Sequence, residues 1–429
     1  MQEGQSSSRR VLMIAPYFPP RARVGAERPF KLARYLPSCG WEPLVAHLES
    51  AGEARPGLAE MARLSLRAPF DRTAARPAPA AAKPGKPATK PWLTSAIDRR
   101  FPVDTWWPVL VGQTRRVARA ARAFGVSAVW STADPWSSHA LALRVARALG
   151  LPWVADFRDP WTLCAVRGHE RPGWVRAWDA RCERSYLEHA SAVTFTAAQT
   201  TARYAEAYPE LSGRFHTIEN GFDPAMLTDQ APVVPLSSVP GVLTICFFGR
   251  FRPLSSATRV IETLARVAEL QPTAVSQLRI RMAGPLEAAD EARARRAGVF
   301  EVFEPFQPVA AHAAGPLLEA HDVLWLSTEP GRDEIIPAKL FDYLAARKPI
   351  LSLCQNADVA TILQETGTGT QVTTAHDAAR CLLAALRAKR EGVPMPFGAV
   401  VDPEQVARYG APQRAAQLAA LLDNVAPQA

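Results

Sequence analysis

The feature that most restricts the fold of this chain is a repeated alternation of short apolar runs with longer segments of helical periodicity. The apolar runs are 11–15, 43–48, 126–130, 153–155, 192–196 and 216–219, then 243–248, 278–283, 300–306 and 323–326. Strands that alternate with helices form parallel sheets with helices on both faces. The pattern therefore predicts an α/β protein with two doubly wound, Rossmann-like domains, and 429 residues are enough for two separate cores.

Proline-rich and low-complexity stretches mark the boundaries of these domains. We expect an N-terminal domain over 1–223, a linker over the Pro-rich residues 224–240 and a C-terminal domain over 241–403. A last amphipathic helix is predicted over 412–424, beyond a second break that contains proline. Residues 72–91 have almost nothing apolar to bury, so we expect a disordered basic loop there.

The positive charge of the chain is concentrated in one region. Residues 63–122 contain thirteen Lys or Arg against three Asp, so this region has a formal charge of +10. The whole chain has +9, so the remaining residues together have about −1. One interpretation is a solvated loop. A second is attraction to an anionic membrane surface, since cations beside Trp106 and Trp107 suit a membrane interface. Nucleic acid is disfavoured, because no nucleic-acid-binding motif accompanies the charge.

The cysteines and the hydropathy point to a cytoplasmic protein. The six cysteines are scattered, with no CxxC and no metal-like spacing, which favours reduced thiols. No apolar run approaches the ~18 residues of a spanning helix. The run 11–18 is too short for a signal peptide and ends in Pro19-Pro20, so we interpret it as a first buried strand. Association with the inner face of the membrane would then be peripheral.

Residues 325–351 contain the most chemically informative stretch. A buried strand ends near Leu326, a loop with Gly and Pro follows, and a helix is expected to begin near Pro337. Glu334 lies just before this helix, Lys339 in its first turn and Asp342 three residues later. A helix N-terminus with a lysine beside it favours an anionic ligand such as a diphosphate. The alternative is that Lys339 and Asp342 form an ordinary surface pair.

Polar residues and glycines also follow several other predicted strands. Ligands of doubly wound folds bind at the carboxyl ends of the strands. The residues at these ends are Gly25, Ser131-Thr132, Asp156, Gly249-Arg250, Gly284 and Glu334. We therefore expect the two domains to face each other across a ligand-binding cleft.

Four stretches in this order resemble glycosyltransferase family 4, the retaining sugar transferases of the GT-B architecture. They are Ile14-Ala-Pro-Tyr-Phe-Pro-Pro20 with Gly25, then 131–139 running to 152–161, then Glu219-Asn-Gly-Phe-Asp223, and finally 325–351. The resemblance covers residues 11–425 apart from 72–91. It implies transfer of a sugar from a nucleotide-sugar to a saccharide or lipid-linked acceptor, in the synthesis of a surface polysaccharide or glycoconjugate.

The resemblance assigns the donor site to the C-terminal domain. Glu334 matches the first of two family carboxylates, which contacts the donor sugar, and Asp342 stands where the second, the partner of the ribose, is usually Glu. Arg250 matches a basic residue that braces the diphosphate, and Lys339 is close enough to assist. The remaining residues of the expected donor site are Phe306 and Ile336. Glu329 is a rival for the role of Glu334.

The resemblance also assigns residues of the N-terminal domain. His139 matches a histidine that faces the reacting sugar, although it is also readable as a polar helix residue. Gly25 would let the first loop approach the phosphates. Asp156, Arg158 and Asp159 line the acceptor side or form a structural ion-pair cluster. The helix 412–424 would cross back onto this domain.

Three positions depart from the family pattern. The usual Gly-Gly of the first loop is Gly25-Ala26, the second carboxylate is the shorter Asp342, and Ser256 replaces a basic residue that often follows Arg250.

The chemistry asked of the site is departure of a nucleoside diphosphate from an anomeric carbon, which cations and a helix N-terminus assist. No Asp-x-Asp occurs in the chain, so we expect a metal-independent reaction with the nucleotide-sugar as co-substrate and no other cofactor. A protein nucleophile and same-face attack both remain open for retention. Two other functions remain open: a sugar-nucleotide epimerase and a non-catalytic partner protein. A dehydrogenase is disfavoured, because no strand leads into Gly-x-Gly-x-x-Gly.

Overall fold

The computed structural model divides the chain into two compact units, and each is described by itself. It describes residues 9–21, 24–49, 55–67, 99–164, 170–227, 240–251, 256–309, 311–329, 331 and 334–426. Unit 1 comprises Met1–Glu219 and Ala411–Ala429, and unit 2 comprises Asn220–Gly410. The predicted loop 72–91 and residues 228–239 of the predicted linker lie outside the described residues.

Unit 1 contains a seven-stranded parallel sheet in the order β3-β2-β1-β4-β5-β6-β7. The central strands are buried on both faces, so their sequences are continuous apolar runs rather than alternating ones. The strands are β1 (Arg9–Ile14), β2 (Trp41–Leu48), β3 (Ala62–Leu66), β4 (Ala128–Thr132), β5 (Trp153–Arg158), β6 (Ala192–Phe195) and β7 (Phe215–Thr217).

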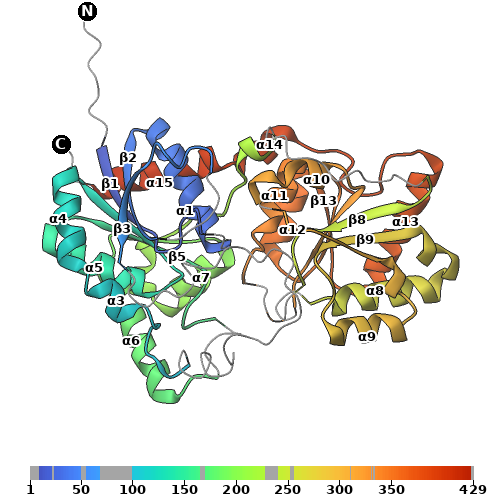
Figure 1. Cartoon of the computed structure of the whole chain (residues 1–429), viewed down its shortest axis with the longest axis horizontal. Helices are drawn as coiled ribbons and strands as arrows, with labels where there is room; N and C mark the ends of the chain where they lie inside the picture. The colour runs from blue at the N-terminus through green and yellow to red at the C-terminus, as the bar shows by residue number, and fades with distance from the viewer. Residues whose placement is uncertain are drawn as a thin grey trace, which may run out of the picture. The chain divides into compact units, whose positions relative to one another are not determined.

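Helices cover both faces of this sheet (Figure 1). One face is covered by α1 (Val24–Tyr35), the short turn η1 (Leu36–Cys39) and α15 (Ala411–Val425), so the last helix of the chain packs beside the first. The helices on the other face are α3 (Trp107–Val111), α4 (Thr114–Phe124), α5 (Ser137–Leu149), α6 (Gly173–His189) and α7 (Ala198–Ala207). A 3-10 turn, η2 (Pro209–Arg214), leads into β7.

Unit 2 repeats the plan with a six-stranded parallel sheet in the order β10-β9-β8-β11-β12-β13. Its strands are β8 (Leu243–Phe247), β9 (Leu278–Ala283), β10 (Phe303–Phe306), β11 (Val323–Ser327), β12 (Ile350–Leu353) and β13 (Gly369–Val372). Its helices are α8 (Thr258–Leu270), α9 (Ala288–Arg296), α10 (Gly315–Glu319), α11 (Lys339–Ala346), α12 (Ala357–Thr366), α13 (Ala375–Glu391) and α14 (Pro403–Arg408). Shorter 3-10 turns are η3 (Pro224–Leu227), η4 (Pro272–Gln277), η5 (Phe300–Val302) and η6 (Ala311–Ala313).

The predicted α/β class with two parallel sheets is confirmed, but two element bounds that matter for the site differ. Strand β5 continues to Arg158, so Asp156 lies inside the strand and not beyond its end. Helix α11 begins at Lys339 rather than near Pro337. One 3-10 turn precedes it, in which the amides of Leu340 and Phe341 donate to the carbonyls of Pro337 and Ala338. No helix among the described residues is both long and apolar enough to cross a membrane.

Candidate functional site

A buried charge cluster lies at the carboxyl end of the sheet in unit 1. The guanidinium of Arg28 donates to both oxygens of Asp156, at 3.0 and 2.9 Å, and both side chains are almost completely buried. Thr132 and Thr194, on the strands either side of β5, each donate a hydroxyl to Asp156 at 2.7 Å. The carboxylate is thus fully occupied by four hydrogen bonds from α1, β4 and β6.

This cluster ties α1 to the strand ends. Burial raises the pKa of Asp156, but the charge of Arg28 and the hydrogen bonds outweigh it and hold the pKa below its usual value. Arg28 also donates to the carbonyl of Glu219 at 2.8 Å, and the Glu219 carboxylate pairs with Arg414 of α15. Asp156 thus forms a buried ion pair with Arg28, and its contact with an acceptor stays a prediction.

Arg158 and Gly25 lie together above this cluster. Arg158 adopts a left-handed backbone conformation with φ 63°, and its Nη1 donates to the carbonyl of Ala133 at 3.0 Å. A Cβ on Gly25 would lie 3.3 Å from that same nitrogen, so the absence of a side chain makes room for the guanidinium. Asp159 follows β5 and is half-buried. That Gly25 and Arg158 contact a ligand stays a prediction.

His139 is completely buried in a box of aromatic rings. Its ring stacks on Phe157 at a centroid distance of 4.8 Å, and Trp136 and Trp153 lie about it at 5.9 and 6.0 Å. Burial lowers its pKa to about 3, so the ring is neutral. As placed, the ring has no surface to offer to a sugar, and its catalytic role stays a prediction.

The hydrogen bonds define the tautomer of His139. The indole of Trp153 donates only, so the Ser131 hydroxyl accepts from it at 2.8 Å. That hydroxyl can then donate to Nδ1 of His139, which it approaches at 2.8 Å. The ring proton is therefore assigned to Nε2, which is buried and has no hydrogen-bond partner among the described residues.

The segment that follows β5 is anchored by another buried carboxyl group. Glu183 of α6 accepts from the backbone amide of Thr162 at 2.6 Å. Burial raises the pKa of Glu183 to about 7. The protonation of one side chain is therefore coupled to how firmly this segment is held.

In unit 2, two cations lie beside two glycines at the carboxyl ends of β8 and β9. A Cβ on Gly284 would meet the guanidinium of Arg250 at 3.2 Å, and a Cβ on Gly249 would lie 3.9 Å from Nζ of Lys339. That ammonium stands 3.6 Å from the ring centre of Phe247. Both glycines have a positive φ, 117° at Gly249 and 76° at Gly284, which other residues rarely adopt. The edge thus combines positive charge with bare backbone.

Helix α11 and the turn before it contain the two predicted carboxylates, Asp342 and Glu334. Asp342 lies in the first turn of the helix and is only 9% exposed, and its contact with a ribose stays a prediction. Glu334 is half-buried in the turn before the helix, and Ile336 between them is buried. Phe306 ends β10, is buried and accepts the amide of Gly284 at 2.9 Å.

Two further contacts position these elements and were not predicted. The hydroxyl of Tyr343, on α11, accepts the amide of Phe248 at 2.9 Å and donates to the carbonyl of Trp325 at 3.1 Å. It therefore fastens α11 to β11 and to the end of β8. Glu329, the rival for the role of Glu334, accepts the amide and hydroxyl of Ser256 at 2.9 and 2.6 Å. Glu329 is thus occupied with holding the segment that leads into α8.

The sequence carried a signal for some of these missed residues. A charged Asp beside an apolar strand needs a cation, and Arg28 belongs to the arginines that follow the first strand. Nothing in the pattern of α6 singled out Glu183, and nothing in α11 distinguished Tyr343 from a core residue. No group of three or more His, Cys, Asp or Glu side chains within the described ranges is placed to hold a metal ion.

Comparison with solved structures identifies the fold. Sucrose-phosphate synthase from Thermosynechococcus elongatus has a TM-score of 0.64 and 14% identity, over 97% of this chain and 98% of that one. HepE from Anabaena in complex with UDP has a TM-score of 0.63 and 12% identity, over 97% of this chain and 100% of that one. WaaG, a glycosyltransferase involved in lipopolysaccharide biosynthesis, has a TM-score of 0.55 and 14% identity, over 95% of this chain and 99% of that one.

Comparison of the sequence gives the family of the N-terminal half. Residues 25–226 match the model of Glycosyltransferase Family 4, and no curated protein matches the chain. Together with the two parallel sheets, the match confirms the family resemblance and the GT-B architecture. Residues 25–226 thus match glycosyltransferase family 4, and the whole chain has the GT-B fold of the similar solved structures.

Proposed function

We propose that the protein is a retaining, metal-independent glycosyltransferase that uses a nucleotide-sugar donor bound at the strand ends of unit 2. The observation that carries the proposal is the pairing of Arg250 and Lys339 with the bare backbone of Gly284 and Gly249. A diphosphate needs cations and close backbone approach, and this edge supplies both. HepE, one of the similar structures, binds UDP and UDP-glucose.

Arg250 and Lys339 act on the leaving group in this proposal. As the bond from the anomeric carbon to the diphosphate breaks, negative charge builds on the phosphate oxygens. Two preorganised cations stabilise that charge more than they stabilise the intact donor, which lowers the barrier. Glu334 contacts the donor sugar, and Asp342 binds the ribose. Arg250 and Lys339 supply the charge that a metal ion supplies elsewhere.

The acceptor in this proposal is a saccharide, free or lipid-linked, and the product contributes to a surface polysaccharide or glycoconjugate. WaaG, a structural neighbour, is described as involved in lipopolysaccharide biosynthesis. The site of action is the cytoplasm, at or near the inner face of the membrane. The six cysteines form no disulfide among the described residues, as is usual in a reducing compartment.

Transfer of label from a panel of radiolabelled nucleotide-sugars to cell-envelope acceptors tests this proposal. Glu334→Gln should abolish transfer and leave the melting temperature unchanged, whereas Glu329→Gln, which acts on α8, should retain transfer. Retained transfer in Glu334→Gln would remove Glu334 from the site. A donor that is isomerised without any acceptor would instead identify an epimerase, and the absence of nucleotide binding would identify a non-catalytic partner protein.

The role of His139 has a separate test. His139→Phe preserves the stacking in the aromatic box and removes both ring nitrogens. Loss of transfer at an unchanged melting temperature would support a catalytic role. Full activity in His139→Phe would show that the ring serves only the packing of unit 1.

A further inference from the structure

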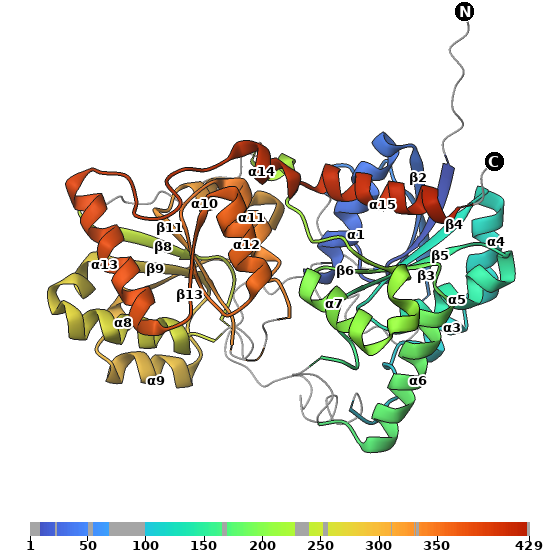
Figure 2. The ribbon, with the colours of Figure 1, turned by 180° about the vertical axis from the view of Figure 1, so that it is seen from behind.

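The outer helix layer of unit 1 contains a groove that no part of the proposed reaction uses. It lies between α3, α5 and α6, which run side by side in both views (Figures 1 and 2), and has a volume of about 540 Å³. Its walls include Trp107, Arg144, Arg147, Trp178, Arg181 and Tyr186.

The charge of the groove has one sign. Arg144, Arg147 and Arg181 are exposed, and none of them forms an ion pair with a described residue. The guanidinium of Arg144 lies 5.9 Å from the ring centre of Trp107. Within the part of the chain that the structure describes, no acidic side chain lines the groove. Three cations that share one hollow without a counter-charge repel one another, and an anionic occupant relieves that repulsion.

The surrounding helices extend the same charge. Helix α4 adds Arg115, Arg119 and Arg122, all exposed and spaced to share one face. Helices α4 and α5 contain no acidic residue. The acidic residues of α6 are already occupied or buried, and they are Asp179 with Arg171, Glu183 in the core and Glu188 with Arg184.

Two exposed tryptophans lie beside the groove. Trp174 is 60% exposed and Trp178 is 50% exposed, and both lie on α6 four residues apart, with Arg181 on the same face. Exposed indoles beside cations are costly in water, because large apolar surface is left hydrated. They suit a membrane–water interface, where the ring enters the headgroup region and the cation meets phosphate.

We propose that this surface, the arginine–tryptophan face of α4, α5 and α6, docks on an anionic lipid bilayer. A lipid phosphate group enters the groove between Arg144, Arg147 and Arg181, and Trp174 and Trp178 lie at the level of the headgroups. The face shares α4, and Trp107 of α3 in the groove wall, with the region 63–122 that the sequence indicated. The proposal does not depend on the proposed transfer reaction, since binding needs neither donor nor acceptor.

Sedimentation of the full-length protein with lipid vesicles tests the proposal. Vesicles of phosphatidylcholine alone are compared with vesicles containing phosphatidylglycerol, at low and high salt. We expect binding to the anionic vesicles only, weakened by salt. The triple variant Arg144→Ala, Arg147→Ala, Arg181→Ala should lower the partition coefficient about a hundredfold, because each arginine near an anionic surface contributes about fivefold.

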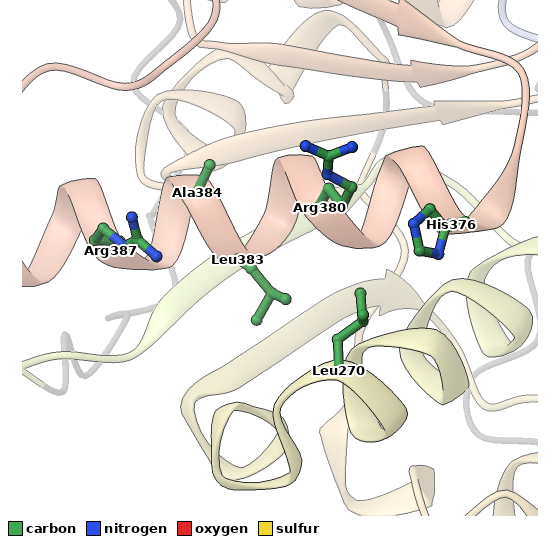
Figure 3. Close-up of a pocket in the computed structure, with 6 residues that line it drawn as sticks. All are labelled: Leu270, His376, Arg380, Leu383, Ala384 and Arg387. Carbon is green, nitrogen blue, oxygen red and sulfur yellow. The ribbon is translucent and has the colours of Figure 1, made fainter.

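A matched control removes the same charge elsewhere. Arg380, Arg387 and Arg390 are exposed on α13 of unit 2, where Arg380 and Arg387 line another hollow beside Leu270 of α8 (Figure 3). Their triple alanine variant should bind anionic vesicles within about twofold of the wild type. Trp174→Ser with Trp178→Ser should weaken binding and abolish the blue shift of tryptophan emission that vesicles cause.

Several outcomes would overturn the proposal. The first is that the protein binds neutral vesicles as well as anionic ones, and the second is that the groove variant and the α13 variant lose binding equally. The third is that deletion of 72–91 abolishes binding whereas the groove variant still binds. Binding of an oligonucleotide that depends on the three groove arginines, without vesicle binding, would assign the face to nucleic acid. Circular dichroism checks that each variant is folded. Sugar transfer to a soluble acceptor is measured in parallel, so that loss of vesicle binding is distinguished from loss of the transfer reaction.

Discussion

Replacing Arg28 by methionine should destabilise unit 1 strongly. The change removes the two hydrogen bonds to Asp156 and the bond to the carbonyl of Glu219, and it leaves a carboxyl with no cation in the core. Breaking a buried pair by removing one partner costs about 3–5 kcal/mol. With a urea dependence of about 2–3 kcal/mol per M, a loss of about 4 kcal/mol lowers the unfolding midpoint by roughly 1.3–2 M.

Tryptophan fluorescence follows this transition in unit 1. Ten of the eleven tryptophans precede Glu219, and only Trp325 belongs to unit 2. The matched control is Arg184→Met, which breaks an exposed pair with Glu188 on α6. Exposed pairs contribute little to stability because water and salt screen them, so the control should move the midpoint little.

The pH dependence gives an independent check of the cause. Because the pKa of Asp156 is lowered in the folded state, the ionised carboxylate stabilises the fold at any pH above the pKa of the unfolded state. This contribution is lost as the pH falls through the pKa of the folded state. Without Arg28, burial is opposed only by the hydroxyls, and the carboxyl takes up a proton more readily. The gap between variant and wild type should therefore be smaller at about pH 4.5 than at about pH 7.5. An equal gap at both, or a midpoint like that of Arg184→Met, would refute the reasoning.

Two further predictions concern single buried groups. Tyr343→Phe leaves the amide of Phe248 and the carbonyl of Trp325 without their partner, which should cost unit 2 about 1–3 kcal/mol by calorimetry; an unchanged melting temperature would show that these bonds are dispensable. For Glu183, a folded pKa of about 7 means that stability falls as pH rises from about 4.5 through 7. Glu183→Gln should thus be more stable than the wild type at about pH 8 and not at about pH 5, and a gain of equal size at both would contradict the shift.

The fold was largely predictable because local and global signals agree. Strands buried on both faces are continuous apolar runs, and their alternation with helices leaves little choice but parallel sheets. Elements without such a signal were missed: β3, whose residues are mostly half-buried, and β13, with the sequence Gly-Thr-Gln-Val. Both strands lie at the edge of a sheet and pair with a single neighbouring strand. Their residues are mostly half-buried, so their sequences lack a continuous apolar run.

The site was predictable only in part. Arg250, Lys339 and Asp342 come from one glycine-marked strand end and one helix, so sequence spacing could place them. Partners distant in sequence could not be placed: Arg28 and Asp156 are 128 residues apart, and Phe248 and Tyr343 are 95 apart. The burial of His139 was also invisible, because a polar residue near a helix start looks the same whether it faces solvent or a ring of aromatic side chains.

The most direct test of the central claim is the affinity of a nucleoside diphosphate for Lys339→Gln. A thermal-shift screen of UDP, GDP, ADP, CDP and dTDP first identifies the base, since a ligand of the folded state raises the melting temperature. Calorimetry then compares the wild type, Lys339→Gln and Lys348→Gln, which removes the same charge just beyond the other end of α11.

A hydrogen bond to a charged group contributes about 1.5–3 kcal/mol, so Lys339→Gln should weaken binding roughly ten- to a hundredfold. Lys348→Gln should bind like the wild type. If no diphosphate in the panel shifts the melting temperature, or if Lys339→Gln binds as tightly as Lys348→Gln, the strand ends of unit 2 are not the donor site.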